Sequence, residues 1–266
     1  MKRIAIGLAY DGSAFEGWQS QPSGNTVQDH LQAALSAVAA SPIRVQGAGR
    51  TDAGVHACAQ VAHFDVEVER PESAWVRGAN AHLPDGIAVQ WAKEVDREFS
   101  ARFSAAARSY TYVLYNHPIR PALYAHQVGW FHLPLDEDAM QRAAELLLGE
   151  QDFSAFRSAE CQAKSPMRIM EEARISRHGP YLIFKFRANA FLHHMVRNLV
   201  GSLVYIGKGA HAMEWIGEVL ASRDRGRAAP TFPAAGLYLS GVQYPDAWRL
   251  PAFLPMMPFD FLTTDA

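Results

Sequence analysis

The residues best suited to chemistry lie in one stretch, Gly47-Ala48-Gly49-Arg50-Thr51-Asp52-Ala53-Gly54-Val55-His56-Ala57. Apolar runs flank it at residues 43–46 and 58–66, so we predict a loop between two strands. Its glycines let the backbone turn tightly and approach a ligand closely. Asp52 is the only carboxylate in this loop, and a carboxylate that is ionised at neutral pH suits a nucleophile or a base.

Two other interpretations of this loop are more ordinary. An Asp-x-Gly sequence is commonly a simple turn in which the aspartate bonds its own backbone. A dinucleotide-binding loop would need a glycine at position 52. The chain has Asp52 there, which would repel a pyrophosphate, and it contains no Walker-type phosphate loop.

The loop and five further motifs, in order along the chain, carry a resemblance to a known family. The string Gly-Arg-Thr-Asp-Ala-Gly-Val-His of the loop resembles the signature of the tRNA pseudouridine synthase I family, and the similarity extends along nearly the whole chain. The other matching segments are residues 10–12 with 17–19, 99–105, 108–112, 189–198 and 236–239. Ser20 departs from the pattern, because the family often has an arginine there.

The resemblance implies an enzyme without cofactor or metal that acts on uridines at positions 38, 39 and 40 of the tRNA anticodon stem-loop. Such an enzyme breaks the N1–C1′ bond, rotates the uracil and joins C5 to C1′. Asp52 would be the catalytic aspartate and nucleophile, and Tyr110 would stack on the target base. The sequence leaves open whether Asp52 attacks the sugar, attacks the base or takes a proton from C2′. The resemblance also implies a homodimer.

Arg197 is the expected ionic partner of Asp52. The segment 191–206 around it is apolar on most faces, which indicates a buried helix, where an unpaired guanidinium is costly. We therefore hypothesise that Arg197 reaches Asp52 across a cleft. The alternative is that Arg197 bonds backbone carbonyls elsewhere.

Four further residues are candidates for substrate contacts or supporting roles. Arg50 is expected to bind a phosphate or the Asp52 carboxylate, and His56 to contact a phosphate. Adjacent residues on a helix point about a quarter-turn apart, so His193 and His194 are not expected to share a metal as residues four apart can. We interpret them as facing RNA or as hydrogen-bonded core histidines. Tyr110 itself would ordinarily be a core residue, since aromatic side chains are enriched in strands.

Composition describes an ordinary globular protein. The 266 residues are 49% hydrophobic and 20% charged, with a net charge of −2 and two cysteines that form no CxxC pair. Apolar runs are shorter than a membrane span needs and no leader is recognised, so we expect a cytoplasmic protein. Residues 151–229 carry 12 Lys and Arg against 7 Asp and Glu, which is compatible with a basic surface for RNA.

The order of elements predicts an α+β fold. Strands are expected at 2–10, 43–46, 58–66 and 87–93, with helices at 26–40 and 71–83, which is a split βαβ unit of ferredoxin-like type. A loose repeat follows, with strands at 110–115, 168–177, 181–188 and 236–242 and helices at 136–148, 191–206 and 211–221. We predict two ferredoxin-like halves whose sheets join into one antiparallel-rich sheet, with helices on one face and a catalytic cleft between the halves.

The predicted boundaries are an N-terminal half at 1–105, a C-terminal half at 106–245 and a proline-rich tail at 246–266 that lies on a surface. Two competing functions remain to be weighed. A non-catalytic RNA-binding protein of two RRM-like halves would need stacking aromatics in an RNP pattern. A nucleoside or glycoside hydrolase would need a second carboxylate, which the loop lacks.

Overall fold

The computed structural model describes residues 1–252, which form two compact units. One unit contains residues 1–106 and 238–252, and the other contains Ala107–Leu237. The first unit thus ends at residue 106, and the strand from Tyr238 onward groups with it. The part of the predicted tail from residue 253 to 266 lies outside the described residues.

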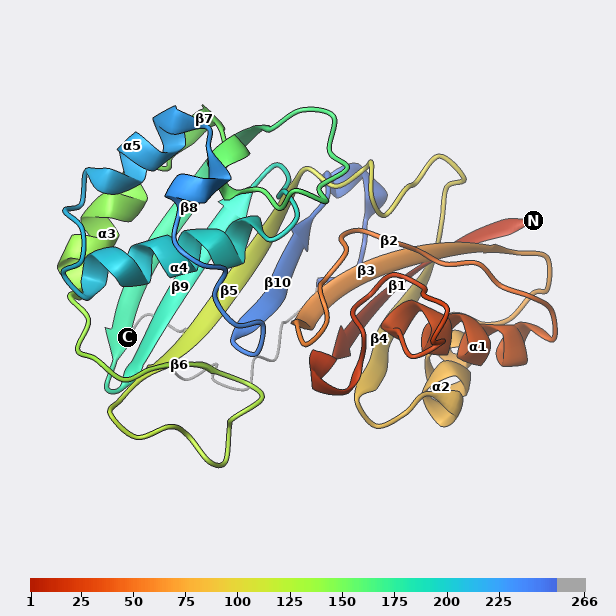
Figure 1. Ribbon diagram of the computed structural model, residues 1–266. Coiled ribbons are helices and arrows are strands. Elements are labelled where there is room, and N and C mark those ends of the chain that lie inside the picture. The colour runs from red at the N-terminus through yellow and green to blue at the C-terminus, as the bar shows by residue number, and fades with distance from the viewer. Residues whose placement is uncertain (253–266) are drawn as a thin grey trace. The chain divides into compact units, whose positions relative to one another are not determined.

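The N-terminal unit is built on an antiparallel sheet (Figure 1). Its strands are β1 (Lys2–Tyr10), β2 (Gln46–Gly47), β3 (His56–Val66), β4 (Ile87–Val95) and β10 (Leu237–Gln243). The central order is β4-β1-β3, and both β2 and β10 pair with β3. Strand β10 runs parallel to β3, with Tyr238 opposite His56.

Two helices, α1 (Val27–Ala39) and α2 (Glu72–His82), cover one face of this sheet. Helix α1 begins as predicted at Thr26, whose hydroxyl oxygen accepts the amide of Asp29. Such a cap satisfies one of the free N–H groups of the first turn. The fully buried Trp75 of α2 meets the edge of Phe64 of β3, with ring centres 5.1 Å apart. Even-numbered residues of β3 therefore face the helices.

The predicted strand at residues 43–46 is almost absent, because only Gln46–Gly47 pairs as a strand. Ile43 and Val45 are buried as their apolar character requires. Their N–H groups, however, donate to the side chains of Ser36 and Gln32 on α1. The helix side chains replace the strand partner that the pattern had suggested.

The opposite face of the N-terminal sheet is covered by irregular segments. Phe99 and Ala101 are fully buried against Val61. Trp248, in the short helical turn Asp246–Trp248, packs its ring against Phe99 with centres 5.2 Å apart, and Leu250 packs on the same cluster. The described part of the tail thus lies on the sheet, and β3 is buried on both faces.

In the C-terminal unit the strands of the sheet follow the order β5-β9-β8-β7, and these neighbours pair antiparallel. Its strands are β5 (Ala107–Asn116), β6 (Gly129–Phe131), β7 (Gly149–Asp152), β8 (Met167–His178) and β9 (Tyr181–Ala188). The hairpin of β8 and β9 is confirmed. The short strands β6 and β7 were not predicted; β6 pairs in parallel with β5.

Helices α3 (Glu137–Glu145), α4 (Met195–Gly207) and α5 (Trp215–Ser222) lie over one face of this sheet (Figure 1). Helix α4 starts four residues later than predicted, because the preceding backbone bonds elsewhere. The carbonyl of His193 accepts the amide of Ser158, and His194 adopts a left-handed φ of 62° that ends the extended segment.

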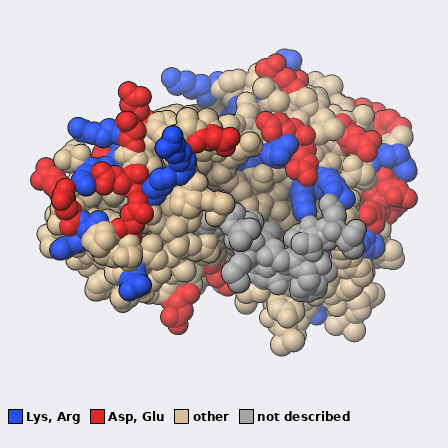
Figure 2. Space-filling view, turned by 180° about the vertical axis from the view of Figure 1, so that it is seen from behind, with Lys and Arg blue, Asp and Glu red and all other residues tan. Residues whose placement is uncertain are grey.

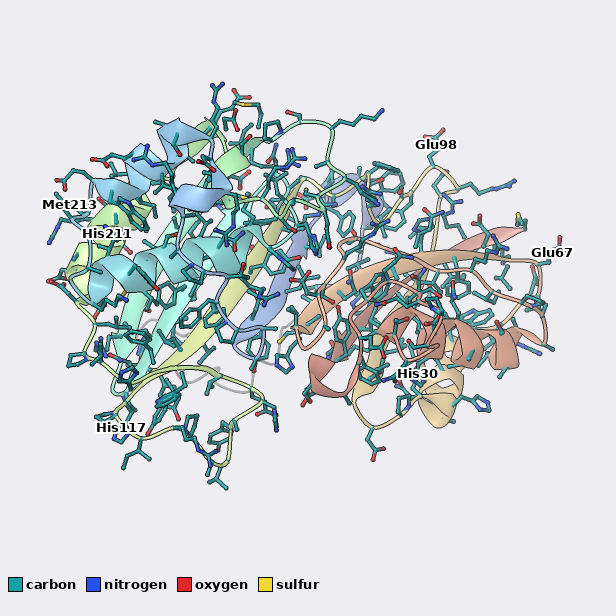
Figure 3. The ribbon with its side chains drawn as sticks, viewed as in Figure 1. His30, Glu67, Glu98, His117, His211 and Met213 are labelled. Atoms are coloured by element: carbon teal, nitrogen blue, oxygen red, sulfur yellow. The ribbon has the colours of Figure 1, made fainter. Side chains whose placement is uncertain are left out.

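Helix α5 also starts four residues late, at Trp215 instead of His211. The His211 ring stacks on that of Trp215 with centres 3.9 Å apart (Figure 3). The chain is a mixed α+β protein. Within residues 1–252, none of the helices has the length and apolar character needed to cross a membrane.

Candidate active site

Asp52 opens a tight turn in the loop between β2 and β3. Its carbonyl accepts the amide of Val55 at 3.1 Å, and Gly54 has a φ of 76°. Glycine suits this left-handed position because it has no Cβ to clash. Asp52 is half-buried and Arg50 is exposed. The backbone of Asp52 therefore forms the turn that the ordinary interpretation predicts.

The motif at residues 10–19 packs directly against this loop. Trp18 donates its amide to the carbonyl of Thr51 at 3.0 Å. A Cβ on Gly17 would stand 2.6 Å from that same carbonyl oxygen and 3.0 Å from the carbonyl carbon of Asp52. The two sequence motifs thus form one structural unit, in which the first supports the backbone of the second. Ser20 lies just beyond and donates its hydroxyl to Asp29.

Strand β3 carries three buried polar side chains, each of which accepts a backbone N–H from a separate segment. His56 Nδ1 accepts from Gly12 at 3.0 Å, Gln60 Oε1 from Gly49 at 3.3 Å, and His63 Nδ1 from Ala101 at 3.1 Å. The three are between 0 and 4% exposed. Buried polar groups need such partners, so these bonds tie three loops to the central strand. This role of Gln60 and His63 was not predicted from the sequence. A polar residue within an otherwise apolar strand could have indicated it.

His56 is more deeply buried than a residue that binds a phosphate is expected to be. It is 2% exposed, its ring stacks on Tyr238 with centres 4.7 Å apart, and its Nδ1 lies 3.1 Å from a carboxylate oxygen of Asp11. These contacts favour a supporting role beside the loop. A direct contact with the substrate stays a prediction.

Tyr110 lies on β5 opposite Phe186 of β9 and is 8% exposed. Its ring meets the edge of the Phe191 ring, with centres 5.0 Å apart and planes at 79°. Such edge contacts between aromatic rings are favourable and fix the ring plane. The ring that sequence resemblance assigns to base stacking is therefore held by a second aromatic residue of its own unit.

Arg197 projects from α4 toward an extended segment of the same unit. Its Nε donates to the carbonyl of Phe232 at 2.8 Å, and Phe232 returns a backbone bond to the carbonyl of Arg197 at 3.2 Å. Burial raises the pKa of the neighbouring Tyr112, and the positive charge of Arg197 acts in the opposite direction. Arg197 thus makes at least one bond to a backbone carbonyl, which is the contact expected under the alternative to pairing with Asp52.

Asn198, the residue after Arg197, holds the same segment, residues 230–232, in place. Asn198 is fully buried, donates to the carbonyl of Phe156 at 2.8 Å and accepts from the hydroxyl of Thr231 at 2.7 Å. A Cβ on Gly201, one turn later, would lie 2.4 Å from the carbonyl oxygen of Pro230. The segment therefore lies tightly against α4, and this orients the Arg197 guanidinium.

His193 and His194 precede α4 and are not part of it. His194 is its N-terminal flanking residue, and the two rings lie 4.0 Å apart between centres. The helical geometry assumed for them from the sequence is therefore wrong.

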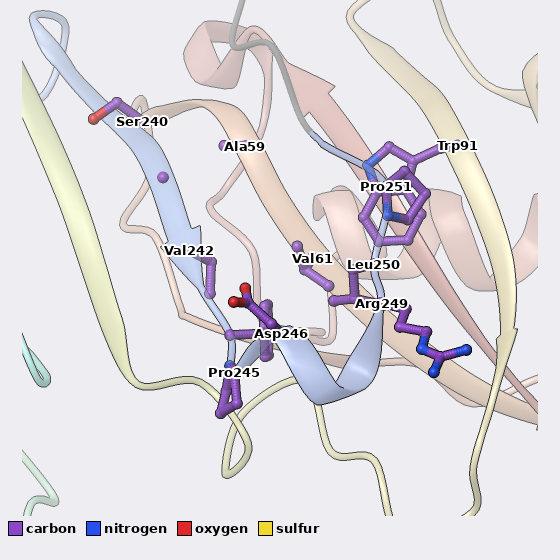
Figure 4. Close-up of a pocket in the computed structure, with 12 residues that line it drawn as sticks. Ala59, Val61, Trp91, Ser240, Val242, Pro245, Asp246, Arg249, Leu250 and Pro251 are labelled. Atoms are coloured by element: carbon purple, nitrogen blue, oxygen red, sulfur yellow. The ribbon is translucent and has the colours of Figure 1, made fainter.

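The N-terminal unit also has a pocket of about 310 Å³ on the sheet face opposite the helices (Figure 4). Val61 of β3, Trp91 of β4 and Val242 of β10 line it, together with Asp246, Arg249 and other residues of the chain's last described segment. None of the five predicted site residues lines this pocket.

Charged side chains of both signs are interspersed on the face seen in Figure 2. In the C-terminal unit, several of the basic residues form ion pairs, such as Arg187 with Glu171 at 2.9 Å and Arg223 with Asp152 at 3.1 Å. The excess of basic residues in 151–229 is thus partly neutralised locally.

Comparison with known proteins identifies the class to which this fold and loop belong. The family model described as tRNA pseudouridine synthase matches residues 8–104 and 143–245. The chain belongs to this family, and by that membership it is an isomerase that acts on tRNA.

Individual relatives agree with this assignment. The chain is 59% identical over 262 residues to the tRNA pseudouridine synthase A of Aromatoleum aromaticum, covering 97% of this chain and 99% of that protein. It is 58% identical over 259 residues to the protein of the same name from Thiobacillus denitrificans, covering 97% and 100%. A solved Cbf5-Nop10-Gar1 complex is a remote match, at 13% identity and a TM-score of 0.37 over 89% of this chain and 48% of that chain.

Proposed function

We propose that this protein converts uridine to pseudouridine at positions 38, 39 and 40 of the tRNA anticodon stem-loop, without a cofactor, and that Asp52 is the catalytic nucleophile. In the reaction the N1–C1′ bond breaks and a C5–C1′ bond forms. The proton on C5 is lost to solvent, and N1 gains one. The observation that carries the proposal is the Asp52 turn, in which the carbonyls of Thr51 and Asp52 both accept backbone amides while Asp52 itself is only half-buried.

Asp52→Asn tests the role of the carboxylate. This change keeps the shape of the side chain and removes its charge and nucleophilicity, so we expect turnover to fall by at least about 10⁴-fold, as for a nucleophile that no other group can replace. Release of tritium from tRNA labelled at C5 of uridine measures the reaction. Release at the normal rate would rule out Asp52. Free uracil would indicate a hydrolase, and binding without release would indicate a non-catalytic RNA-binding protein.

Transcripts with a single uridine at position 38, 39 or 40 test the assignment of sites. We expect tritium release from each of the three. A transcript with uridine only elsewhere in the anticodon stem is the matched control, and release from that transcript alone would overturn the positional assignment.

Tyr110 is proposed to stack on the target uracil. Stacking of a base on an aromatic ring contributes about 1–3 kcal/mol, which offsets part of the few kcal/mol needed to extrude a base. The edge contact with Phe191 supports this role, because it fixes the ring plane. Tyr110→Phe keeps the ring and should retain most activity, whereas Tyr110→Ala should not. Equal losses in the two variants would assign the role to the hydroxyl group.

Arg197 is proposed to supply the positive charge that favours an ionised aspartate and binds substrate. Its partly buried guanidinium and its bond to the Phe232 carbonyl support a fixed position for this charge. Arg197→Met should abolish turnover while the protein stays folded. Near-normal turnover in a folded Arg197→Met variant would exclude this role.

Arg50 is proposed to bind a phosphate, in line with its exposure in the loop. Loss of one phosphate contact should reduce the magnitude of the slope of log K for tRNA binding against log salt concentration by about 0.7–0.9. Arg50→Gln is therefore expected to weaken tRNA binding with a shallower salt dependence. An unchanged slope would contradict a phosphate contact. His56 as a substrate contact stays part of the proposal, tested in the same assay by His56→Gln.

The homodimer, which rests on family resemblance, and the cytoplasmic location, which rests on the short apolar runs and the unrecognised leader, belong to the proposal. Light scattering of the purified protein and cell fractionation test them. The ferredoxin-like description is also a proposal; in the N-terminal unit it is supported by the order β4-β1-β3-β2 with α1 and α2 as connections. The joined sheet and the cleft between halves remain predictions from the sequence.

A further inference from the structure

The loop that carries Asp52 is fastened to the core by one buried amide side chain, that of Gln60. Gln60 lies on β3, is 0% exposed, and faces the helix side of the N-terminal sheet. Its Nε2 donates to the carbonyl of Gly49 at 2.8 Å, and its Oε1 accepts the amide of the same residue at 3.3 Å. The carboxamide therefore binds one peptide residue through both of its polar ends.

The same side chain reaches the loop by a second route. Gln60 Nε2 lies 3.4 Å from the hydroxyl of Tyr10, and that hydroxyl lies 2.8 Å from Oγ1 of Thr51. Tyr10 and Thr51 are 4% and 6% exposed, and burial raises the pKa of Tyr10, so its hydroxyl keeps its proton and can donate. The Gln60 amide thus donates to the Tyr10 hydroxyl, and a further hydrogen bond joins that hydroxyl to the Thr51 hydroxyl.

These bonds hold the chain at Gly49 and at Thr51, the residue before Asp52. A buried network in which every group has its partner is rigid, because each broken bond leaves a desolvated polar group. Catalysis by a positioned side chain is sensitive to displacements of about 1 Å. A network of this kind beside a catalytic loop therefore affects the rate as well as the stability.

We propose that Gln60, through Gly49 and the Tyr10–Thr51 pair, is a positioning residue that aims the Asp52 carboxylate at the substrate. The inference rests on the proposed role of Asp52. Gln60 touches no reacting atom and acts only through the backbone of the loop. Its loss should lower kcat by a larger factor than it raises KM for tRNA, because only one of the proposed substrate contacts, Arg50, lies between Gly49 and Thr51.

The chain provides a matched control. Asn80 on α2 binds the backbone of Val89 in the same two-ended way, donating to its carbonyl at 2.8 Å and accepting its amide at 2.7 Å. Asn80 belongs to the same unit and bonds none of the loop residues named above. Gln60→Met and Asn80→Leu each keep the approximate shape of the side chain. The first removes the two bonds to Gly49 and the one to Tyr10, and the second removes the two bonds to Val89.

The experiment measures single-turnover tritium release, KM for tRNA, thermal stability and amide hydrogen exchange for both variants, at a temperature where both are folded. We expect kcat of Gln60→Met to fall by about 10- to 100-fold, with faster exchange in residues 47–55. Asn80→Leu should lose stability but keep its kcat. Tyr10→Phe should lower kcat through the same network, so the double variant with Gln60→Met should lose less than the product of the two single effects.

An unchanged kcat in Gln60→Met, or equal kcat losses in Gln60→Met and Asn80→Leu, would overturn the positioning role. Asp52→Asn, assayed beside them, separates this failure from that of the proposed function. If Asp52→Asn is inactive and Gln60→Met is normal, only the positioning inference fails. If Asp52→Asn is active, the proposed function of Asp52 fails and the inference fails with it.

Discussion

Replacing Gly17 by alanine tests whether the motif at residues 10–19 determines the position of Asp52. Gly17 has a φ of 88°, and a left-handed backbone costs an ordinary residue about 1–2 kcal/mol. The new Cβ would also stand 2.6 Å from the Thr51 carbonyl oxygen and 3.0 Å from the Asp52 carbonyl carbon. Both are backbone atoms, so the contact can be relieved only by moving the loop.

Gly24 provides the control for the conformational cost alone. Its φ is 71°, and a Cβ there would have no other atom within 4 Å. Gly24→Ala should therefore lose only about 1–2 kcal/mol of unfolding free energy and keep its turnover. Gly17→Ala should lose more, and its kcat should fall by about 10- to 100-fold, because the displaced loop carries the reacting carboxylate.

Urea unfolding and tritium release from labelled tRNA, measured on both variants under conditions where both are folded, give the two quantities. The prediction is refuted if Gly17→Ala and Gly24→Ala lose equal unfolding free energy and Gly17→Ala keeps a normal kcat. That result would mean that the loop accommodates the methyl group without moving Asp52, and that the two motifs are not mechanically linked.

Three further outcomes follow from the surroundings of single residues. Burial lowers the pKa of His63, so the stability contributed by its neutral form is complete above about pH 6.5 and is lost as the pH falls below that value; His63→Gln should flatten the stability curve measured between pH 7 and 5. The bond from Arg3 lowers the pKa of Asp65, so its contribution is present above about pH 4 and lost below it, and Asp65→Asn should reduce the acid dependence of unfolding. Tyr112→Phe removes a hydroxyl that donates to the Pro233 carbonyl at 2.9 Å, and calorimetry should show a loss of about 1–2 kcal/mol.

Much of the local structure could be predicted from the sequence because it depends on neighbouring residues. Periodicity placed β1, α1, α2, β8 and β9, and the pair Thr26 and Asp29 predicted the start of α1. The glycines around Asp52 predicted a loop, and Gly54 indeed has a left-handed φ. These features follow from side-chain spacing and backbone preferences within a few residues.

The late start of α4 and the loss of the strand at 43–46 depend on partners outside those segments. The backbone before α4 bonds Ser158, and that of Ile43 bonds the Ser36 hydroxyl. A backbone N–H or carbonyl needs a partner, but local sequence does not say which partner is nearest in the folded chain. For that reason apolar character predicted the burial of these segments correctly and their secondary structure incorrectly.

The sequence by itself determined the family, the loop and the identity of the candidate residues, because these depend on residue types in a fixed order. Only the tertiary structure decided how the loop is held. It brought Gly17 against the Asp52 backbone, buried His56 and placed Gln60 beneath Gly49. The physical reason is that these contacts join residues far apart in the chain, from 11 positions for Gly49 and Gln60 to 44 for Gly12 and His56. Their geometry is set by the packing of both faces of β3.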